Sequence, residues 1–238
     1  TRHMQMSKYR ILTTHVGSLP RPKSLIDFIV SEDAGKEVDE ESFEATLAHT
    51  VKEVVKLQKE LGIDIVSDGE FSKRGFAVYA HERLGGLEPT GNSRPSPWAI
   101  SRESNSFPDF YSQELATRDA KPTKSSMQMA CTGPIVYKGE KQLHRDLSNL
   151  RNACNAADLQ SAFMPAISPS DVVGNQINEF YSSEEEFLYA VADALNTEYR
   201  AIVDAGFLLQ IDDPRLINYY IKNPDLSLKQ CRAWAESQ

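Results

Sequence analysis

Hydrophobic and polar positions follow two different periods along this chain. In residues 40–61 the apolar side chains recur every three to four positions, and Gly62 follows as a helix stop. This spacing predicts an amphipathic helix. The next segment, "IDIVSDGEF" at 63–71, has a short apolar run that ends in an acidic, glycine-containing turn. That pattern predicts a buried strand with a polar tip.

The order of helix, strand and polar tip recurs along the chain. Helices are predicted near 142–158 and over 183–205. Strands are predicted in five segments, at 11–20, 63–71, 125–134, 161–170 and 206–214. Alternating strands and helices imply an α/β fold with a parallel sheet and right-handed crossovers. Ligands collect at the carboxyl ends of such strands, and all five predicted ends carry polar residues, Gly or Pro.

Residues 71–122 break this rhythm. They are rich in Gly, Pro, Ser and Asn with scattered aromatic residues, too long for a simple connection and too aromatic for a flexible linker. We interpret them as an insertion folded over the site. The first five residues resemble the remnant of an expression tag, and residues 6–238 are predicted to form a single domain.

Composition narrows the class of protein. The net charge of −8, without a Lys/Arg cluster, predicts no nucleic-acid partner. No apolar run reaches the length of a bilayer span, which predicts no membrane partner and a cytoplasmic location. Cys131, Cys154 and Cys231 form no CxxC spacing, so reduced thiols are expected.

Acidic and histidine side chains follow the predicted strands. They are His15 after the first strand, Asp68 and Glu70 after the second, and Asp212 and Asp213 after the last. Carboxylates at the ends of parallel strands converge, where they could bind a cation, hold a substrate amine or move a proton. The structural alternatives are a turn or helix cap for each aspartate, and a hydrogen-bonded structural role for His15.

The turn "VGSLP" at 16–20 suits an anion. Exposed backbone N–H groups and the hydroxyl at Gly17 and Ser18 could receive a carboxylate. The chain has no GxSxG motif, so a nucleophilic serine is not expected. It also has no HxC, CxxC or HExxH spacing, and no metal ligands or catalytic residues are assigned from the sequence.

Four motifs in this order resemble one family. They are "TTHVGSLPRP", "DIVSDGEFSK", "CTGPIVYKG" and "LLQIDDPRL", and they span residues 11–216. The combination is similar to the C-terminal catalytic domain of cobalamin-independent methionine synthase, in the methionine synthase/uroporphyrinogen decarboxylase superfamily. The resemblance implies a TIM (β/α)8-type barrel, of which this chain would supply about five βα units and lack the C-terminal part.

The resemblance also implies roles for individual residues. Gly17 and Ser18 would receive the carboxylate of a homocysteine-like substrate, and Glu70 and Asp212 would hold its ammonium group. Asp68 stands where the family has His before Gly-Glu, and Leu-Pro-Arg-Pro replaces Phe-Pro-Gln-Thr after Gly-Ser.

The implied activity is a zinc-dependent methyl or alkyl transfer to a small thiol. The donor could be a methylated folate, a methylated sulfur compound or an epoxide-type electrophile. The family's His-x-Cys, Glu and second Cys ligands would follow the last residue of this chain, so zinc binding and activity are expected only when the missing strands complete the barrel. The chain is accordingly expected to self-associate or to bind a complementary C-terminal segment.

Two alternatives remain open. One is a ligand-binding or assembly subunit without activity of its own. The other is a relative of uroporphyrinogen decarboxylase, in which Arg21 would pair with a substrate carboxylate.

Overall fold

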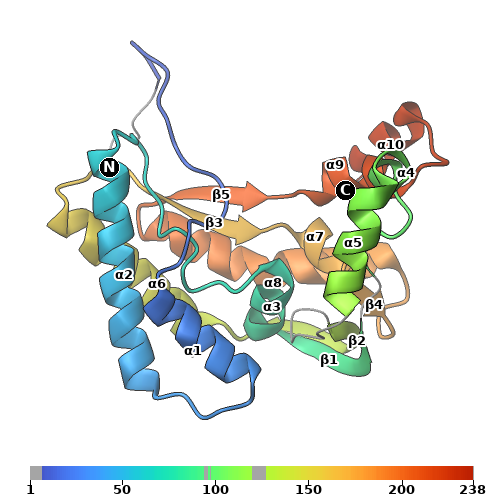
Figure 1. The fold of residues 1–238 in the computed structure, drawn as a ribbon, viewed down its shortest axis with the longest axis horizontal. Coiled ribbons are helices and arrows are strands. Elements are labelled where there is room, and N and C mark those ends of the chain that lie inside the picture. Colours follow the sequence, from blue (N-terminus) through green and yellow to red (C-terminus); the bar gives the residue numbers. More distant parts are fainter. Residues whose placement is uncertain (1–6, 94–95, 97, 120–126, 238) are drawn as a thin grey trace. The chain divides into compact units, whose positions relative to one another are not determined.

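The computed structural model describes residues 7–93, 96, 98–119 and 127–237. The chain divides into two compact units, and each unit is built from three separate segments (Figure 1). Unit 1 comprises Thr1–Leu84, Tyr137–Ala166 and Asp193–Ile211, and unit 2 comprises Gly85–Val136, Ile167–Ala192 and Asp212–Gln238. The expectation of one domain with an insertion at about 71–122 stays a prediction.

The three predicted helices are confirmed. Residues 40–61, 142–158 and 183–205 correspond to α2 (Glu40–Glu60), α6 (Glu140–Ala156) and α8 (Glu184–Asp204). Unit 1 also contains α1 (Lys23–Asp33) and α3 (Phe76–Arg83), and it takes the C-terminal part of α8.

Local chemistry explains why α2 begins where it does. The Asp39 carboxylate accepts a hydrogen bond of 3.0 Å from the backbone N–H of Ser42, which caps the helix. The negative charges of two glutamates in the first turn interact favourably with the positive end of the helix dipole. Leu47, Val51 and Val55 are buried on one face and belong to the core of unit 1, as their spacing predicts.

A parallel array of strand segments lies at the centre of unit 1. Its named strands are β3 (Phe163–Ile167) and β5 (Leu208–Asp212), which pair with each other and point the same way in Figure 1. Parallel bridges join Thr14 to Ile65 and Val66 to Ala162. Four of the five predicted strand segments are therefore neighbours in one array, and the predicted α/β class is confirmed.

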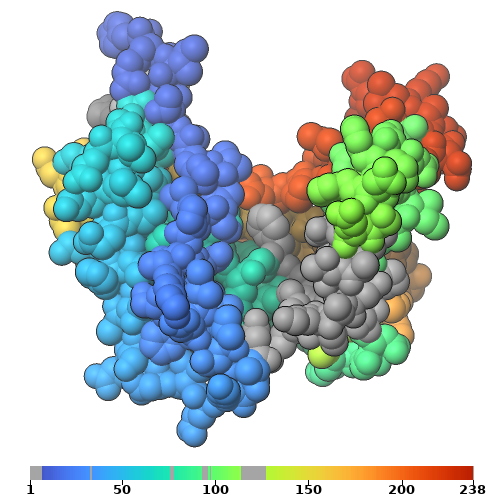
Figure 2. Space-filling model, viewed as in Figure 1, coloured from blue at the N-terminus to red at the C-terminus, as the bar shows by residue number. Residues whose placement is uncertain are grey.

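The first of these segments is less buried than its sequence predicts. Ile11 is 86% exposed and Val16 is 62% exposed. Figure 2 shows the residues before α1, in dark blue, on the outer surface. Thr14 supplies the segment's bridge to the array, and apolar residues on a strand are buried only where neighbouring elements cover them.

The segment predicted as the third strand of one parallel sheet belongs to a different sheet, so this part of the barrel prediction is wrong. In unit 2, β1 (Leu84–Ser93), β2 (Met127–Tyr137) and β4 (Gln176–Asn178) form a three-stranded sheet in the order β1-β2-β4. β2 and β4 are parallel, with Met129 opposite Gln176.

A glycine allows β1 to approach β2. Gly86 has a φ of +85°, and a Cβ atom built there would lie 2.5 Å from the carbonyl oxygen of Pro134. No other residue fits at that distance in that backbone conformation. β1 lies within the predicted insertion, and its Gly-rich and Pro-containing sequence does not read as a strand.

The remaining helices belong to unit 2. They are α4 (Arg102–Ser106), α5 (Pro108–Asp119), α7 (Pro169–Val173), α9 (Arg215–Lys222) and α10 (Leu228–Ala235). Within the residues that the structure describes, no helix has both the length and the apolar character needed to cross a bilayer.

Candidate functional site

The acidic turn after the second predicted strand has an unusual backbone. Gly69 has a φ of +68° and Glu70 a φ of +57°, and the N–H of Glu70 donates a 2.9 Å hydrogen bond to Oδ1 of Asp68. Asp68 therefore acts as a turn former, the structural alternative considered for it. A non-glycine residue in this region costs about 1–3 kcal/mol and is typical of functional sites.

The "VGSLP" turn lies against this acidic turn. Gly17 has a φ of +85°, and the N–H of Leu19 donates to the carbonyl of Gly69 at 3.1 Å. The hydroxyl of Ser18 then donates to Oε2 of Glu70 at 2.6 Å. The structure thus brings together Ser18 and Glu70, which lie 52 residues apart in the sequence.

Several polar groups at this junction lack partners. Glu70 is only 7% exposed, and its second oxygen, Oε1, is buried without a hydrogen-bond partner. Nε2 of His15 is in the same state. Within the described part of the chain, the backbone N–H groups of Gly17 and Ser18 donate no hydrogen bond. The junction therefore offers a buried acceptor, Oε1 of Glu70, together with backbone donors on the partly buried Gly17 and the exposed Ser18. A buried acceptor is rarely left unused.

Arg21 stabilises the acidic turn through hydrogen bonds to its backbone. Its guanidinium donates to the carbonyl oxygens of Glu70, at 2.7 Å, and of Lys73. Burial lowers the pKa of Arg21, and the charges of Glu70 and Asp68 oppose that shift. The structure shows Arg21 as a positioning residue, and its pairing with a substrate carboxylate stays a prediction.

Lys73 is a buried charge that the sequence analysis did not single out. Its ammonium group donates to the carbonyl oxygen of Pro165 and lies 5.1 Å from the ring centroid of Tyr79. Asp68 is also buried, and burial raises its pKa while the charge of Lys73 opposes the shift. Lysine is normally exposed, so no pattern in the sequence marks this burial.

A second set of buried charges lies in unit 1. Arg83 donates to Asp146 at 2.7 Å and to Glu198 at 3.3 Å. Glu198 also receives hydrogen bonds from the hydroxyls of Tyr79 and, at 2.6 Å, Tyr137. All three charged side chains are buried, and burial raises the pKa of Glu198 to about 7.

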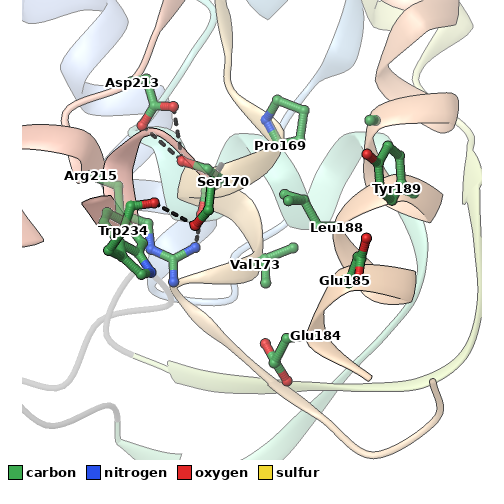
Figure 3. A pocket seen from close by; sticks show the side chains of 12 residues that line it. Pro169, Ser170, Val173, Glu184, Glu185, Leu188, Tyr189, Asp213, Arg215 and Trp234 are labelled. Carbon is green, nitrogen blue, oxygen red and sulfur yellow. Dashed lines mark hydrogen bonds between the residues drawn. The ribbon is translucent and has the colours of Figure 1, made fainter. Parts of the chain in front are cut away.

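The two aspartates at the end of β5, Asp212 as its last residue and Asp213 after it, belong to unit 2. The carbonyl of Asp212 accepts from the N–H of Ser168 at 3.0 Å, and the carboxylate of Asp213 accepts from the hydroxyl of Ser170 at 2.8 and 2.9 Å. Asp213 therefore holds α7, and it lines a pocket of about 540 Å3 with Arg215 (Figure 3). The predicted joint binding of one ammonium group by Asp212 and Glu70 stays a prediction.

The residues that the structure describes do not fit a zinc site. Among them, no group of three or more His, Cys, Asp or Glu side chains is arranged to hold a metal ion. Cys131, Cys154 and Cys231 are buried thiols, which confirms the expectation of reduced cysteines. They lie on β2, α6 and α10 and do not form a ligand set.

Comparison with known proteins shows which family the segment around this site is similar to. Residues 11–110, which include Ser18 and Glu70, match the family model described as the catalytic domain of cobalamin-independent synthase. The predicted resemblance is therefore confirmed.

Relatives in this family extend beyond the matched segment. Methionine synthase from Sulfolobus acidocaldarius is 28% identical over 205 residues, which cover 86% of this chain and 52% of that protein. The 5-methyltetrahydropteroyltriglutamate–homocysteine methyltransferase of Thermotoga petrophila is 24% identical over 85% of this chain and 24% of its own length. The chain thus spans about half, or less, of the curated relatives that it matches.

Solved structures agree on the fold. A B12-independent methionine synthase from Shewanella sp. W3-18-1, in complex with selenomethionine, superposes with a TM-score of 0.62 at 20% identity, over 94% of this chain and 57% of that one. A putative vitamin-B12 independent methionine synthase from Listeria monocytogenes gives a TM-score of 0.58 at 22% identity, over 87% and 54%. At these identities the likeness concerns the fold.

Proposed function

We propose that this chain binds a small amino-acid thiol of the homocysteine type, as the substrate-binding part of a cobalamin-independent methyltransferase. The observation that carries the proposal is the state of Glu70. One carboxylate oxygen accepts from Ser18, and the other is buried without a partner. A buried carboxylate with an unfilled acceptor position suits an ammonium group, because a charge-assisted hydrogen bond stabilises both charges.

The neighbouring donors complete the recognition of an amino acid. The unpaired N–H groups of Gly17 and Ser18 are suited to the substrate carboxylate, while Glu70 holds the ammonium group. Arg21 keeps the turn around Glu70 in place through backbone carbonyls. These contacts would leave the side chain of the substrate, with its thiol, free to point away from the site. Positioning of this kind accelerates group transfer by fixing the reacting sulfur.

The names of the relatives supply the reaction class. They are methionine synthases, and one is a methyltransferase acting between a methylated folate and homocysteine. We infer the same acceptor and donor here. The S–H bond of the thiol and the N–CH3 bond of the donor break, an S–CH3 bond forms, and the proton from the thiol is balanced by the proton that the donor nitrogen gains. Because the described residues do not fit a zinc site, we assign no step to a metal.

Glu70→Gln is expected to weaken homocysteine binding at least tenfold, because the neutral amide loses a charge-assisted hydrogen bond of about 1.5–3 kcal/mol while keeping the shape of the side chain. Isothermal titration calorimetry of this chain with homocysteine measures the loss.

Glu60→Gln is the matched control, since Glu60 lies on the exposed end of α2 in a surface pair with Lys56. It should leave the affinity unchanged. If homocysteine binds to Glu70→Gln as tightly as to the unmodified chain, or does not bind to the unmodified chain at all, the proposal is wrong. A large fall in melting temperature for Glu70→Gln would instead indicate a structural role for the carboxylate.

A further inference from the structure

A second pocket of unit 1, of about 370 Å3, is built almost entirely from charged and polar side chains. We call it the Arg145 pocket. Its walls come from α1, α2, α3, α6 and the segment that follows Glu70. The lining residues used below are Glu32, Glu40, Phe43, Ser72, Arg74, Glu82, Gln142 and Arg145. None of these residues was among the candidate site residues of the sequence analysis.

Arg74 is the cation beside the carboxylates on one side of the Arg145 pocket. Arg74 forms an ion pair with Glu32, and its guanidinium lies 3.8 Å from the carboxylate of Glu82. The side chain of Arg74 is 15% exposed, whereas those of Glu32 and Glu82 are 38% and 37% exposed, so the carboxylates of these pairs remain in contact with water. Glu32 and Glu82 therefore share one guanidinium, which leaves Arg145 as the second cation of the pocket.

Some hydrogen-bond donors on the side of the pocket formed by Arg145 have no acceptor among the described residues. Arg145 donates through Nε to Asp146 at 3.1 Å, and its side chain is 20% exposed. Among the described residues, no hydrogen bond engages its two terminal nitrogens or the side-chain amide of Gln142. The hydroxyl oxygen of Ser72 is buried and also has no partner. Three donor groups thus line one cavity without an acceptor.

We propose that the Arg145 pocket binds a small monocarboxylate. The terminal nitrogens of an arginine form a planar fork that matches two carboxylate oxygens, and a hydroxyl and an amide add single hydrogen bonds. The ring of Phe43, whose centroid lies 5.7 Å from the Arg145 guanidinium, provides an apolar wall for a short aliphatic tail. The carboxylates of Glu32, Glu40 and Glu82 surround the cavity and disfavour an anion with more than one charge.

Propionate is the probe, and propionamide is its uncharged counterpart. Titration of the isotope-labelled chain, followed by the 1H–15N signals of the Arg145 side chain and the Ser72 backbone, should give saturable shifts with propionate. Propionamide should give none. Inorganic phosphate, which carries more charge, should bind more weakly than propionate.

Two variants test the assigned contacts without emptying the pocket. Ser72→Ala removes a hydroxyl that has no hydrogen-bond partner among the described residues, so it should leave folding intact and weaken propionate binding about tenfold. Arg145→Lys keeps the charge beside Asp146 and loses the fork, with a loss of similar or greater size. Ser112→Ala, at an exposed position on α5, is the matched control and should bind propionate normally.

Three results would overturn the proposal. They are the absence of saturable shifts with propionate, equal shifts with propionamide, and tighter binding of phosphate. Unchanged affinity in both Ser72→Ala and Arg145→Lys would also reject it, because the probe would then bind elsewhere. The proposal does not depend on the thiol site, since Glu70→Gln should leave propionate binding unchanged.

Discussion

Replacing Arg83 with methionine is expected to lower the free energy of unfolding by about 3–5 kcal/mol. The guanidinium of Arg83 is buried between the carboxylates of Asp146 and Glu198, at 2.7 and 3.3 Å. Methionine fills much of the same volume but supplies no positive charge, so a buried carboxylate loses its main partner. Removing one partner of a buried ion pair lowers the stability by more than the pair contributes to it, because the remaining charge stays buried without a partner.

Urea unfolding of the Arg83→Met chain, followed by circular dichroism, measures this change. Arg200→Met is the matched control, because Arg200 is exposed on α8 and, among the described residues, donates only to Asn196, at 3.2 Å. Its effect should stay within about 0.5 kcal/mol. The double variant Arg83→Met/Glu198→Gln should recover part of the loss, since it removes one of the unpaired carboxylates. A loss below about 1 kcal/mol for Arg83→Met would show that these charges are solvated in the folded chain.

Glu198 is expected to make the stability of the chain fall as the pH rises from weakly acidic to neutral. Burial raises the pKa of Glu198 from 4.5 to about 7. Below pH 4.5 Glu198 is protonated in both the folded and the unfolded state, so its full contribution to the stability of the folded chain is present. Between the two values only the folded state holds the proton, and the stability is lost as the pH rises through 7.

Glu198→Gln removes this titration and provides the measurement. Between about pH 5 and about pH 8 the stability of the unmodified chain, relative to Glu198→Gln, should fall by about 2–3 kcal/mol. The buried Asp68 has a raised pKa as well, but it is present in both proteins and cancels in the difference. Glu60→Gln changes an exposed position, and its stability should depend on pH in the same way as that of the unmodified chain. A constant difference between the unmodified chain and Glu198→Gln across this range would contradict the raised pKa.

The two turns of the candidate site could be recognised in the sequence because each is a local motif, whereas their roles in binding a thiol were implied by the resemblance and stay predictions. "VGSLP" and "DGE" each fix their own turn, and Gly17, Gly69 and Glu70 adopt the positive φ values that such turns require. The hydrogen bond between Ser18 and Glu70 followed once the two turns met at the ends of neighbouring parallel segments. The position of Asp212 relative to this pair stays a prediction, since it belongs to unit 2.

The helices α2, α6 and α8 were determined by the sequence itself, because an amphipathic period repeats over many residues and needs no distant partner to be recognised. The sheet to which β2 belongs was decided by the tertiary structure, where Gly86 lets another strand approach within contact distance. The buried charges were decided there as well. Arg83 meets Asp146 across 63 residues of sequence, and Tyr79 meets Glu198 across 119. From the sequence one can say only that burying a charged side chain is costly. The partners that offset this cost are distant in the sequence and come together only when the chain folds.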